Sequence, residues 1–127
     1  MELNEISGAI VHHSVQIHTI LGPGLLESVY QRILAYELRK AGLNVQSEVP
    51  VPVQWDGRTI DEGYRVDLVV EGVVLVELKS VERISKVHPK QVLTYLKLTN
   101  IKLGLLINFG APLLKDGIYR IANGLQE

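Results

Sequence analysis

The sequence contains no cysteine, and other features that it lacks narrow the class of protein further. Without thiols the chain can form neither a disulfide framework nor a thiolate zinc site. The amino terminus has no basic segment, and no apolar run approaches the roughly 20 residues that cross a bilayer. We therefore expect a cytoplasmic protein that is neither secreted nor embedded in a membrane.

Lysine and arginine are absent from positions 1–30 and concentrated further along the chain. Between positions 79 and 102, six basic residues accompany a single acidic one, although the whole chain has a net charge of −1. A one-sided cationic stretch is what a nucleic-acid phosphate backbone requires. A solvated helix and loop would have the same composition, so charge alone leaves both interpretations open.

The hydrophobic pattern predicts a single domain over residues 1–127, since this length suffices for one core and not for two. Apolar spacings of three and four predict helices over residues 3–20, up to about 41, and from 88 onward. The first two helices are expected to bury Ile6, Ile10, His13, Ile17, Ile20, Leu26, Val29, Tyr30, Ile33, Leu34 and Leu38. Strands are expected over about 44–53, 64–70, 74–80, 102–109 and 117–122, with a hairpin turn at 55–58. The expected fold is an α/β (α+β) domain with a mixed sheet.

Two apolar stretches in the middle of the chain, VDLVV and VVLVELKS, contain Asp67, Glu77 and Lys79. Side chains alternate along a strand, so Glu77 and Lys79 share one face. A two-residue turn at 71–72 would put Asp67 on the opposite face, whereas a three-residue loop at 71–73 pairs Asp67 with Glu77. Burial favours the three-residue loop, because a one-residue slip reverses every side chain. That register gives one continuous apolar face made of Val66, Leu68, Val70, Val74, Val76 and Leu78.

Asp67 and Glu77 predict a metal site if they face each other across this hairpin. Two opposed carboxylates repel unless a proton or a cation lies between them. Their oxygens are hard ligands, and no histidine or cysteine joins the set, which favours Mg²⁺ or Mn²⁺ over zinc. An exposed strand face with alternating charge would have the same spacing, so the pattern by itself leaves a purely structural role open.

Three elements of the sequence together resemble the PD-(D/E)xK nuclease superfamily. The first is Asp67 followed after a hairpin by Glu77-Leu78-Lys79, with Val66 where the superfamily name has proline. The second, Gln91-Val-Leu-Thr-Tyr95, is similar to the Q-x3-Y element of the exonuclease-like branch. The third, Gly24-Leu-Leu-Glu27-Ser-Val-Tyr30, looks like the motif of the small GxxExxY family. The elements occur in family order over residues 3–121.

The resemblance implies a restriction-endonuclease-like α-β-β-β-α-β core with an extra N-terminal helix and a short C-terminal strand. It also implies a metal site in which Asp67, Glu77 and the main-chain carbonyl of Leu78 hold Mg²⁺ or Mn²⁺. Glu27 would supply a further carboxylate, either to the metal or to Lys79. These roles follow from the family's motifs and go beyond what spacing indicates.

The remaining motif residues would complete the reaction site. By resemblance, Lys79 would position or deprotonate the attacking water. Gln91 and Tyr95 lie one helical turn apart, on one face, and would orient the lysine or a substrate phosphate. For Tyr30, packing in the core is the expected role.

The leading hypothesis is a metal-dependent nuclease that hydrolyses phosphodiester bonds in DNA. Phosphate contacts are expected from Arg83, Lys86, His88, Lys90 and Lys97, although His88 would serve equally as a helix cap. Trp55, beside the hairpin turn, would either pack on the sheet or stack on a base.

Two other hypotheses stay open. The first is a nucleic-acid-binding module that keeps the nuclease fold without activity in isolation. The second is a subunit that pairs with another copy through its sheet edge or its first two helices. Cutting of duplex DNA would also be compatible with a homodimer.

Overall fold

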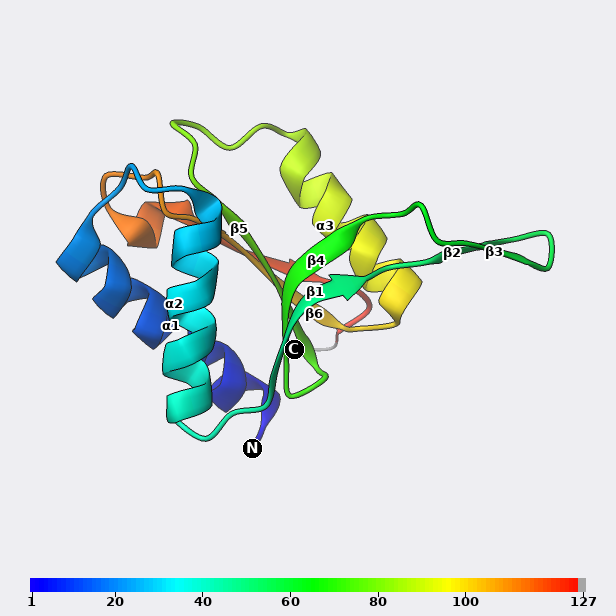
Figure 1. Ribbon diagram of the computed structural model, residues 1–127, viewed down its shortest axis with the longest axis horizontal. Helices are drawn as coiled ribbons and strands as arrows, with labels where there is room; N and C mark the ends of the chain where they lie inside the picture. The colour runs from blue at the N-terminus through cyan, green and yellow to red at the C-terminus, as the bar shows by residue number, and fades with distance from the viewer. Residues whose placement is uncertain (126–127) are drawn as a thin grey trace.

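A computed structural model describes residues 1–125, and it consists of a sheet with helices on both faces (Figure 1). The helices are α1 (Leu3–Leu21), α2 (Glu27–Lys40), α3 (Val87–Thr99) and the short 3₁₀ helix η1 (Leu114–Gly117). The main sheet contains β1 (Val45–Pro50), β4 (Arg65–Val70), β5 (Val74–Lys79), β6 (Leu103–Asn108) and β7 (Ile118–Ala122). Two further strands, β2 (Val53–Trp55) and β3 (Arg58–Ile60), form a separate ribbon.

The main sheet has the strand order β1-β4-β5-β6-β7. Strands β5 and β6 are parallel, and the other three neighbouring pairs are antiparallel. Helix α3 makes the crossover between the two parallel strands, as a parallel pair requires. The predicted α/β fold with a mixed sheet, N-terminal helices and a C-terminal strand is confirmed.

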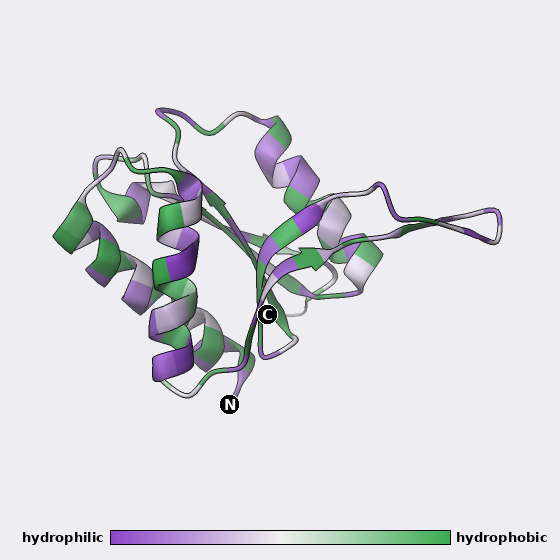
Figure 2. Ribbon diagram, viewed as in Figure 1, coloured by the Kyte–Doolittle hydropathy of each residue, from purple (hydrophilic) through white to green (hydrophobic). Residues whose placement is uncertain are grey.

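Hydrophobic and hydrophilic residues alternate along the helices (Figure 2), and α1 and α2 bury only part of the predicted apolar stripe. Ile20, expected in the core, is 82% exposed in the last turn of α1, and Leu26 is 74% exposed because it precedes the first turn of α2. Val29 is also exposed, so these three predictions were wrong. Within residues 1–125, no helix is both long and apolar enough to cross a membrane.

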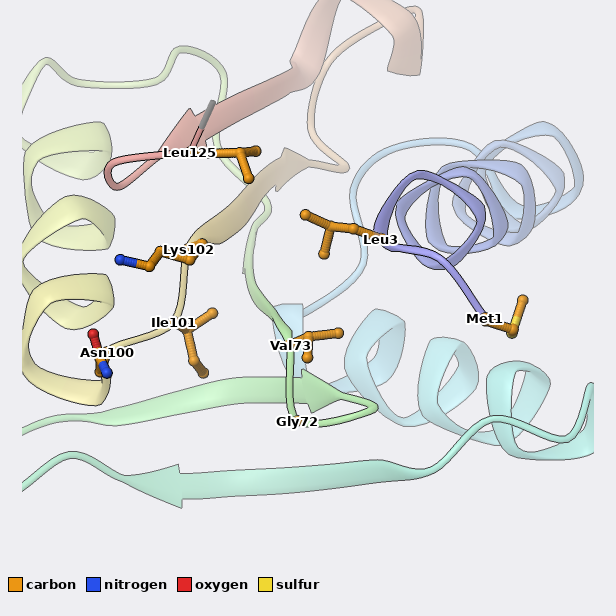
Figure 3. A pocket seen from close by; sticks show the side chains of 8 residues that line it. All are labelled: Met1, Leu3, Gly72, Val73, Asn100, Ile101, Lys102 and Leu125. Atoms are coloured by element: carbon orange, nitrogen blue, oxygen red, sulfur yellow. The ribbon is translucent and has the colours of Figure 1, made fainter. Parts of the chain in front are cut away.

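The sheet end where β4 turns into β5 contains a shallow apolar hollow of about 320 Å³ (Figure 3). The start of α1, the turn before β5, the loop between α3 and β6, and Leu125 surround it. Its lining residues are Met1, Leu3, Gly72, Val73, Asn100, Ile101, Lys102 and Leu125. Among residues 1–125, no acidic side chain lines this hollow.

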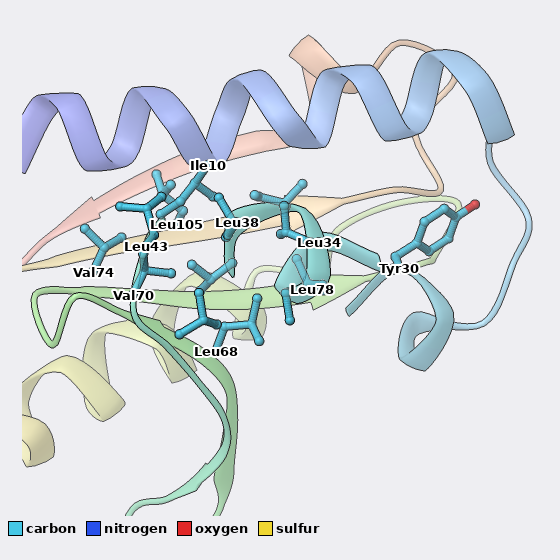
Figure 4. Close-up of a cluster of buried hydrophobic side chains, with 14 of the residues drawn as sticks. Ile10, Tyr30, Leu34, Leu38, Leu43, Leu68, Val70, Val74, Leu78 and Leu105 are labelled. Atoms are coloured by element: carbon cyan, nitrogen blue, oxygen red, sulfur yellow. The ribbon is translucent and has the colours of Figure 1, made fainter. Parts of the chain in front are cut away.

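The larger core lies between the sheet and the pair α1 and α2 (Figure 4). Ile10 from α1 and Leu34 and Leu38 from α2 are fully buried against the sheet. Tyr30 is also fully buried, and its ring stacks on Phe109 with a centroid distance of 4.3 Å. The expected packing role of Tyr30 is therefore confirmed.

The smaller core lies between the sheet and α3. Val92 and Leu96 of α3 are buried against Leu75 and Leu106. Helix and sheet approach closely here, because a Cβ added at Gly104 would lie 2.8 Å from a methyl group of Val92. The close contact fixes α3 over the central strands.

The ribbon of β2 and β3 extends away from the body of the molecule (Figure 1). Trp55 pairs with Arg58 around a two-residue turn in which Asp56 and Gly57 both have positive φ, of 51° and 74°. Such a turn matches the twist of a hairpin, and the predicted turn is confirmed. Trp55 is 72% exposed, which excludes packing on the sheet.

Candidate functional site

The register of the β4–β5 hairpin brings the two predicted carboxylates together. Leu68 pairs with Val76 and Val70 with Val74, so the connection is the three-residue loop 71–73. Continuing this register by one residue places Asp67 opposite Glu77. The prediction of the three-residue loop is therefore confirmed.

One member of the predicted apolar face lies elsewhere. Val66 is buried, but it belongs to the smaller core beside Val51 instead of the larger core that contains Leu68. The pairing of β4 with β1 skips the position of Asp67, where Glu48 on β1 has a left-handed φ of 53°. This local irregularity breaks the alternation that the sequence prediction assumed.

Where the β4–β5 ladder ends, side chains replace the missing main-chain hydrogen bonds. The Asp67 N–H donates to Glu77 Oε1 at 2.9 Å, and the Leu78 N–H donates to Asp67 Oδ2 at 2.8 Å. Each carboxylate is thus anchored to the main chain of the opposite strand. In the described part of the chain Asp67 Oδ1 has no hydrogen-bond partner, so it is available to a ligand.

Burial raises the pKa values of both acids. The pKa of Glu77 rises to about 8, first because the side chain is buried and second because Asp67 is negative. The pKa of Asp67 rises to about 6 through burial, against the hydrogen bond from Leu78, and Glu48 and Glu27 raise it further. At neutral pH such a pair retains a proton unless a cation replaces it. The two acids therefore have the chemistry of a hard-cation site.

Lys79 lies at the end of β5, half-buried and opposite Asn108 of β6. Its charge lowers the pKa of both Asp67 and Glu77, so the ammonium acts on the carboxylate pair. Among residues 1–125 the one ion pair within 4.0 Å joins Lys40 and Glu37. The Lys79 ammonium is therefore near the carboxylates without being locked in a salt bridge to either.

Glu27 approaches this pair from the first turn of α2. Its charge is one cause of the raised pKa of Asp67, which puts the two side chains in electrostatic reach. The Ser80 hydroxyl donates to the Leu25 carbonyl at 2.6 Å and ties the loop before α2 to the end of β5. An open hollow of about 470 Å³ lies here, lined by Gly24, Leu25, Leu26, Glu27, Ser28 and Ser80.

Tyr30 fixes the loop that precedes Glu27. Its hydroxyl donates to the Gly22 carbonyl at 2.6 Å and accepts the Leu25 N–H at 3.2 Å. Gly24 has a φ of 108°, a conformation that side chains rarely adopt. The buried tyrosine thus holds the loop from which Glu27 begins the helix.

Tyr95 joins the site through a residue that the sequence interpretation missed. Its ring stacks on Tyr64 at 4.7 Å, and the Tyr64 hydroxyl donates to Glu77 Oε2 at 3.3 Å. Burial, followed by the charge of Glu77, raises the pKa of both phenols, so both stay neutral donors. Gln91, one turn before Tyr95, is exposed and forms no hydrogen bond in the described part of the chain.

Gln31 and Glu48 form a second missed connection. The Gln31 side-chain amide donates to Glu48 Oε1 at 3.1 Å and to the Asp67 carbonyl at 3.4 Å. Gln31 is buried and lies one helical turn after Glu27, a spacing that places both on one helix face. That spacing was the available signal, whereas no sequence pattern marks Glu48.

Asn108 is a third missed residue, and it supports the segment that follows Lys79. Its side-chain oxygen accepts the N–H groups of Val81 and Gly110, each at 3.0 Å, and its amide donates to the Val81 carbonyl at 2.9 Å. The Phe109 N–H donates to the Lys79 carbonyl at 2.8 Å. A side chain at Gly110 would collide with the Val81 main chain. These contacts fix the end of β5.

The predicted phosphate contacts divide into two groups. Arg83, Lys86 and Lys90 are exposed on the segment after β5 and the start of α3. Lys97 is exposed in the last turn of α3, about 15 Å along the helix axis from its start. His88 Nδ1 accepts the Ser85 N–H at 3.3 Å, a local contact at the start of the helix.

The two central carboxylates do not form a complete metal cage by themselves. Among residues 1–125, no three histidine, aspartate or glutamate side chains lie close enough together to hold an ion. The donor chemistry nevertheless fits Mg²⁺ or Mn²⁺, because the hard oxygens of buried Glu77 and half-buried Asp67 face each other. Either ion usually keeps several water ligands, so a small number of protein ligands suffices.

Comparison with known proteins agrees with this geometry. The family model of the PD-(D/E)XK nuclease superfamily matches residues 4–121, nearly the whole chain. Searches among curated proteins and solved structures gave no match. The matched range contains the carboxylate pair, Lys79 and every strand of the main sheet except the last residue of β7. The chain belongs to the PD-(D/E)XK nuclease superfamily.

Proposed function

We propose that this protein is a metal-dependent nuclease of the GxxExxY family that hydrolyses phosphodiester bonds in DNA. The proposal rests on the pair Asp67 and Glu77, each of which accepts a hydrogen bond from the main chain of the opposite strand where the β4–β5 pairing ends. Lys79 follows Glu77 by two residues. The fold alone does not imply a function, so the proposal depends on this site. Membership of the nuclease superfamily supports the same conclusion.

Asp67 and Glu77 would hold the metal ion, with the Leu78 carbonyl as a further oxygen ligand. When bound, Mg²⁺ or Mn²⁺ lowers the pKa of a water ligand and offsets charge that develops on phosphate oxygens. Glu27 would add a negative charge beside Asp67 and so favour a divalent cation at this position.

The residues around the carboxylates have separate roles in this proposal. Lys79 would orient the attacking water or accept its proton, and its positive charge would stabilise the anionic phosphate. Tyr64 would hold Glu77 in place by its hydrogen bond, with Tyr95 stacked behind it. Gln91 would orient a substrate phosphate from the exposed face of α3.

The substrate would be held by its phosphates. Arg83, Lys86 and Lys90 lie on the segment that leaves the site and on the first turn of α3 (Figure 1). Contacts to phosphate position a strand without reading its sequence. His88 and Lys97 would extend this surface along α3.

The experiment that tests the proposal is cleavage of DNA by the wild type and by the variant Lys79→Ala, in Mg²⁺ and in Mn²⁺. We expect cleavage by the wild type and none by Lys79→Ala, with folding and DNA binding nearly intact. Lys115→Ala, which removes an exposed lysine of η1, serves as the control for a general loss of charge. Equal cleavage by the wild type and Lys79→Ala would contradict the proposal.

A second candidate is a nucleic-acid-binding module that keeps the fold without activity in isolation. The observation in its favour is that residues 1–125 contain no group of three acidic or histidine side chains close enough to enclose a metal. Calorimetric titration of Mn²⁺ into the wild type and Asp67→Ala separates the two candidates. Binding that disappears in Asp67→Ala supports the enzyme. Salt-dependent DNA affinity without metal binding or product supports the module.

A further inference from the structure

A second groove lies beside the carboxylates, between α2 and β1. Its volume is about 420 Å³, and it is separate from the hollow in front of Glu27. In Figure 1, α2 runs down one side of the sheet and β1 returns next to it in the opposite direction. The polar residues that line the groove are Ser28, Gln31, Arg32, Arg39, Ser47 and Glu48.

The groove adjoins the carboxylate site. Ser28 lines both this groove and the hollow in front of Glu27. Gln31, in the wall of the groove, donates to the main-chain carbonyl of Asp67. A chain molecule bound at Asp67 could therefore continue along α2 without leaving the protein surface.

The groove contains two guanidinium groups. Arg32 and Arg39 are seven residues apart on α2, which places them on one helix face two turns from each other. Neither forms an ion pair with a carboxylate in the described part of the chain. Arg39 donates to the Val45 carbonyl at 2.8 Å and to the Ser47 hydroxyl at 3.3 Å, so β1 holds its side chain over the groove.

One carboxylate, Glu48, reduces the positive charge of the groove without cancelling it. Glu48 accepts the Gln31 amide at 3.1 Å, on the side that faces Asp67. The lining residues thus carry two positive charges and one negative charge. The hydroxyls of Ser28 and Ser47 add neutral hydrogen-bond donors beside the guanidinium groups.

We infer that this groove binds a phosphate group of the nucleic acid strand that occupies the carboxylate site. The inference rests on the proposed function, and it adds a phosphate subsite on the α2 side. A guanidinium group presents donors in a planar fork that matches phosphate oxygens, and serine hydroxyls complete such a site. The strand would then contact positive residues on both flanks of the carboxylates: Arg32 and Arg39 on one, and Arg83, Lys86 and Lys90 on the other.

The test measures binding of a fluorescent DNA oligonucleotide by anisotropy at several KCl concentrations. All proteins carry Lys79→Ala, so that the oligonucleotide is not cut, and Mg²⁺ is present throughout. Arg32→Gln is the test variant, because Arg32 is exposed and its replacement is therefore expected to leave the fold intact. Lys40→Gln is the matched control, since it removes one positive charge from the same helix outside the groove.

We expect Arg32→Gln to weaken binding about three- to tenfold and to lower the slope of log Kd against log salt by about 0.7–0.9, the value of one phosphate contact. Lys40→Gln should leave the slope unchanged. Arg32→Lys keeps a point charge without the fork, so it should retain the slope and recover part of the affinity.

Two results would overturn the inference, and they differ in what they say about the nuclease. If Arg32→Gln has no larger effect than Lys40→Gln while the parent protein binds DNA, the groove is no phosphate subsite and the proposed function stands. If the parent protein binds no oligonucleotide even at low salt, the proposed function fails and the subsite fails with it.

Discussion

The two ends of strand β5 differ in how their hydrogen bonds and charges are satisfied. At the Val74 end, regular pairing with Val70 leads into a tight loop, and the surface next to it is an apolar hollow. At the Lys79 end, the pairing with β4 stops, and buried Glu77 and half-buried Asp67 take over the main-chain hydrogen bonds. The first end depends on local chain geometry. The second depends on support from α2, α3, β1 and β6.

The two ends of β5 also differ in what they contribute to stability and to function. Buried acids with raised pKa values cost folding free energy when they ionise, whereas an apolar hollow does not. Strain and unfavourable burial collect at functional sites because the reaction requires them. The Lys79 end of β5 is therefore where changes should affect activity strongly and the Val74 end where they should not.

Among variants that compare the two ends of β5, the largest effect is expected from removing Glu77. Glu77→Ala takes away one of two acids at the site, and cleavage should fall by at least about 10²-fold, as for other electrostatic groups at a reacting centre. Val73→Ala, in the hollow at the other end of the hairpin, should leave the cleavage rate unchanged. The measurement is the single-turnover rate in saturating Mg²⁺. If both variants lost cleavage to a similar extent, the two ends of β5 would not differ in their contribution to activity.

An intermediate effect is expected from Asn108, which fixes the segment after Lys79. Asn108→Ala leaves the Val81 main-chain groups without their partners, and we expect a loss of about 1–3 kcal/mol in the free energy of unfolding. Because the end of β5 becomes loose, kcat should fall more than the stability loss explains, while Mn²⁺ affinity changes little.

Asn123→Ala provides the matched control for Asn108→Ala at the other end of the sheet. The Asn123 side chain donates to the Ile101 carbonyl at 3.2 Å, next to the apolar hollow. This variant should lose stability and keep the kcat of the wild type. If both variants reduce kcat equally at a temperature where both are folded, Asn108 has no positioning role.

The smallest effect concerns the pH dependence of stability without metal. Folding raises the pKa of Glu77 from an ordinary 4.5 to about 8, so the folded state binds more protons than the unfolded state between these pH values. The melting temperature in EDTA should therefore fall as the pH rises from 5 to 9. Glu77→Gln should flatten this dependence, and added Mg²⁺ should raise the melting temperature most at high pH. A melting temperature that rises over this range would contradict the burial of a protonated Glu77.

Several features of the fold and of the site could be predicted from residue patterns alone. Alternation and burial gave the three-residue loop and hence the pairing of Asp67 with Glu77. The Asp56-Gly57 turn followed from the positive φ that both residues tolerate. Tyr30 was expected to pack, and it does so against Phe109. In each case the determining interaction is local or follows from a strict period.

Other features depended on contacts between distant elements. Val66 lies in the smaller core, next to the break in the β1–β4 pairing where Glu48 adopts a left-handed conformation. Tyr64 donates a hydrogen bond to Glu77 and stacks on Tyr95 of α3. Gln31 reaches the Asp67 carbonyl across the interface between α2 and the sheet. No spacing within one element encodes the approaches of Val66 and Tyr64, and the spacing of Gln31 from Glu27 indicates only that both lie on one helix face.

The sequence by itself determined the α/β class, the hairpin register and the identity of the two central acids, since periodicity and the cost of burying charge act along each strand. Tertiary structure alone decided which side chains surround those acids and how strongly their pKa values rise. The physical reason is that desolvation and charge–charge interactions depend on distances between elements, and packing sets those distances only when the sheet and helices close around the site.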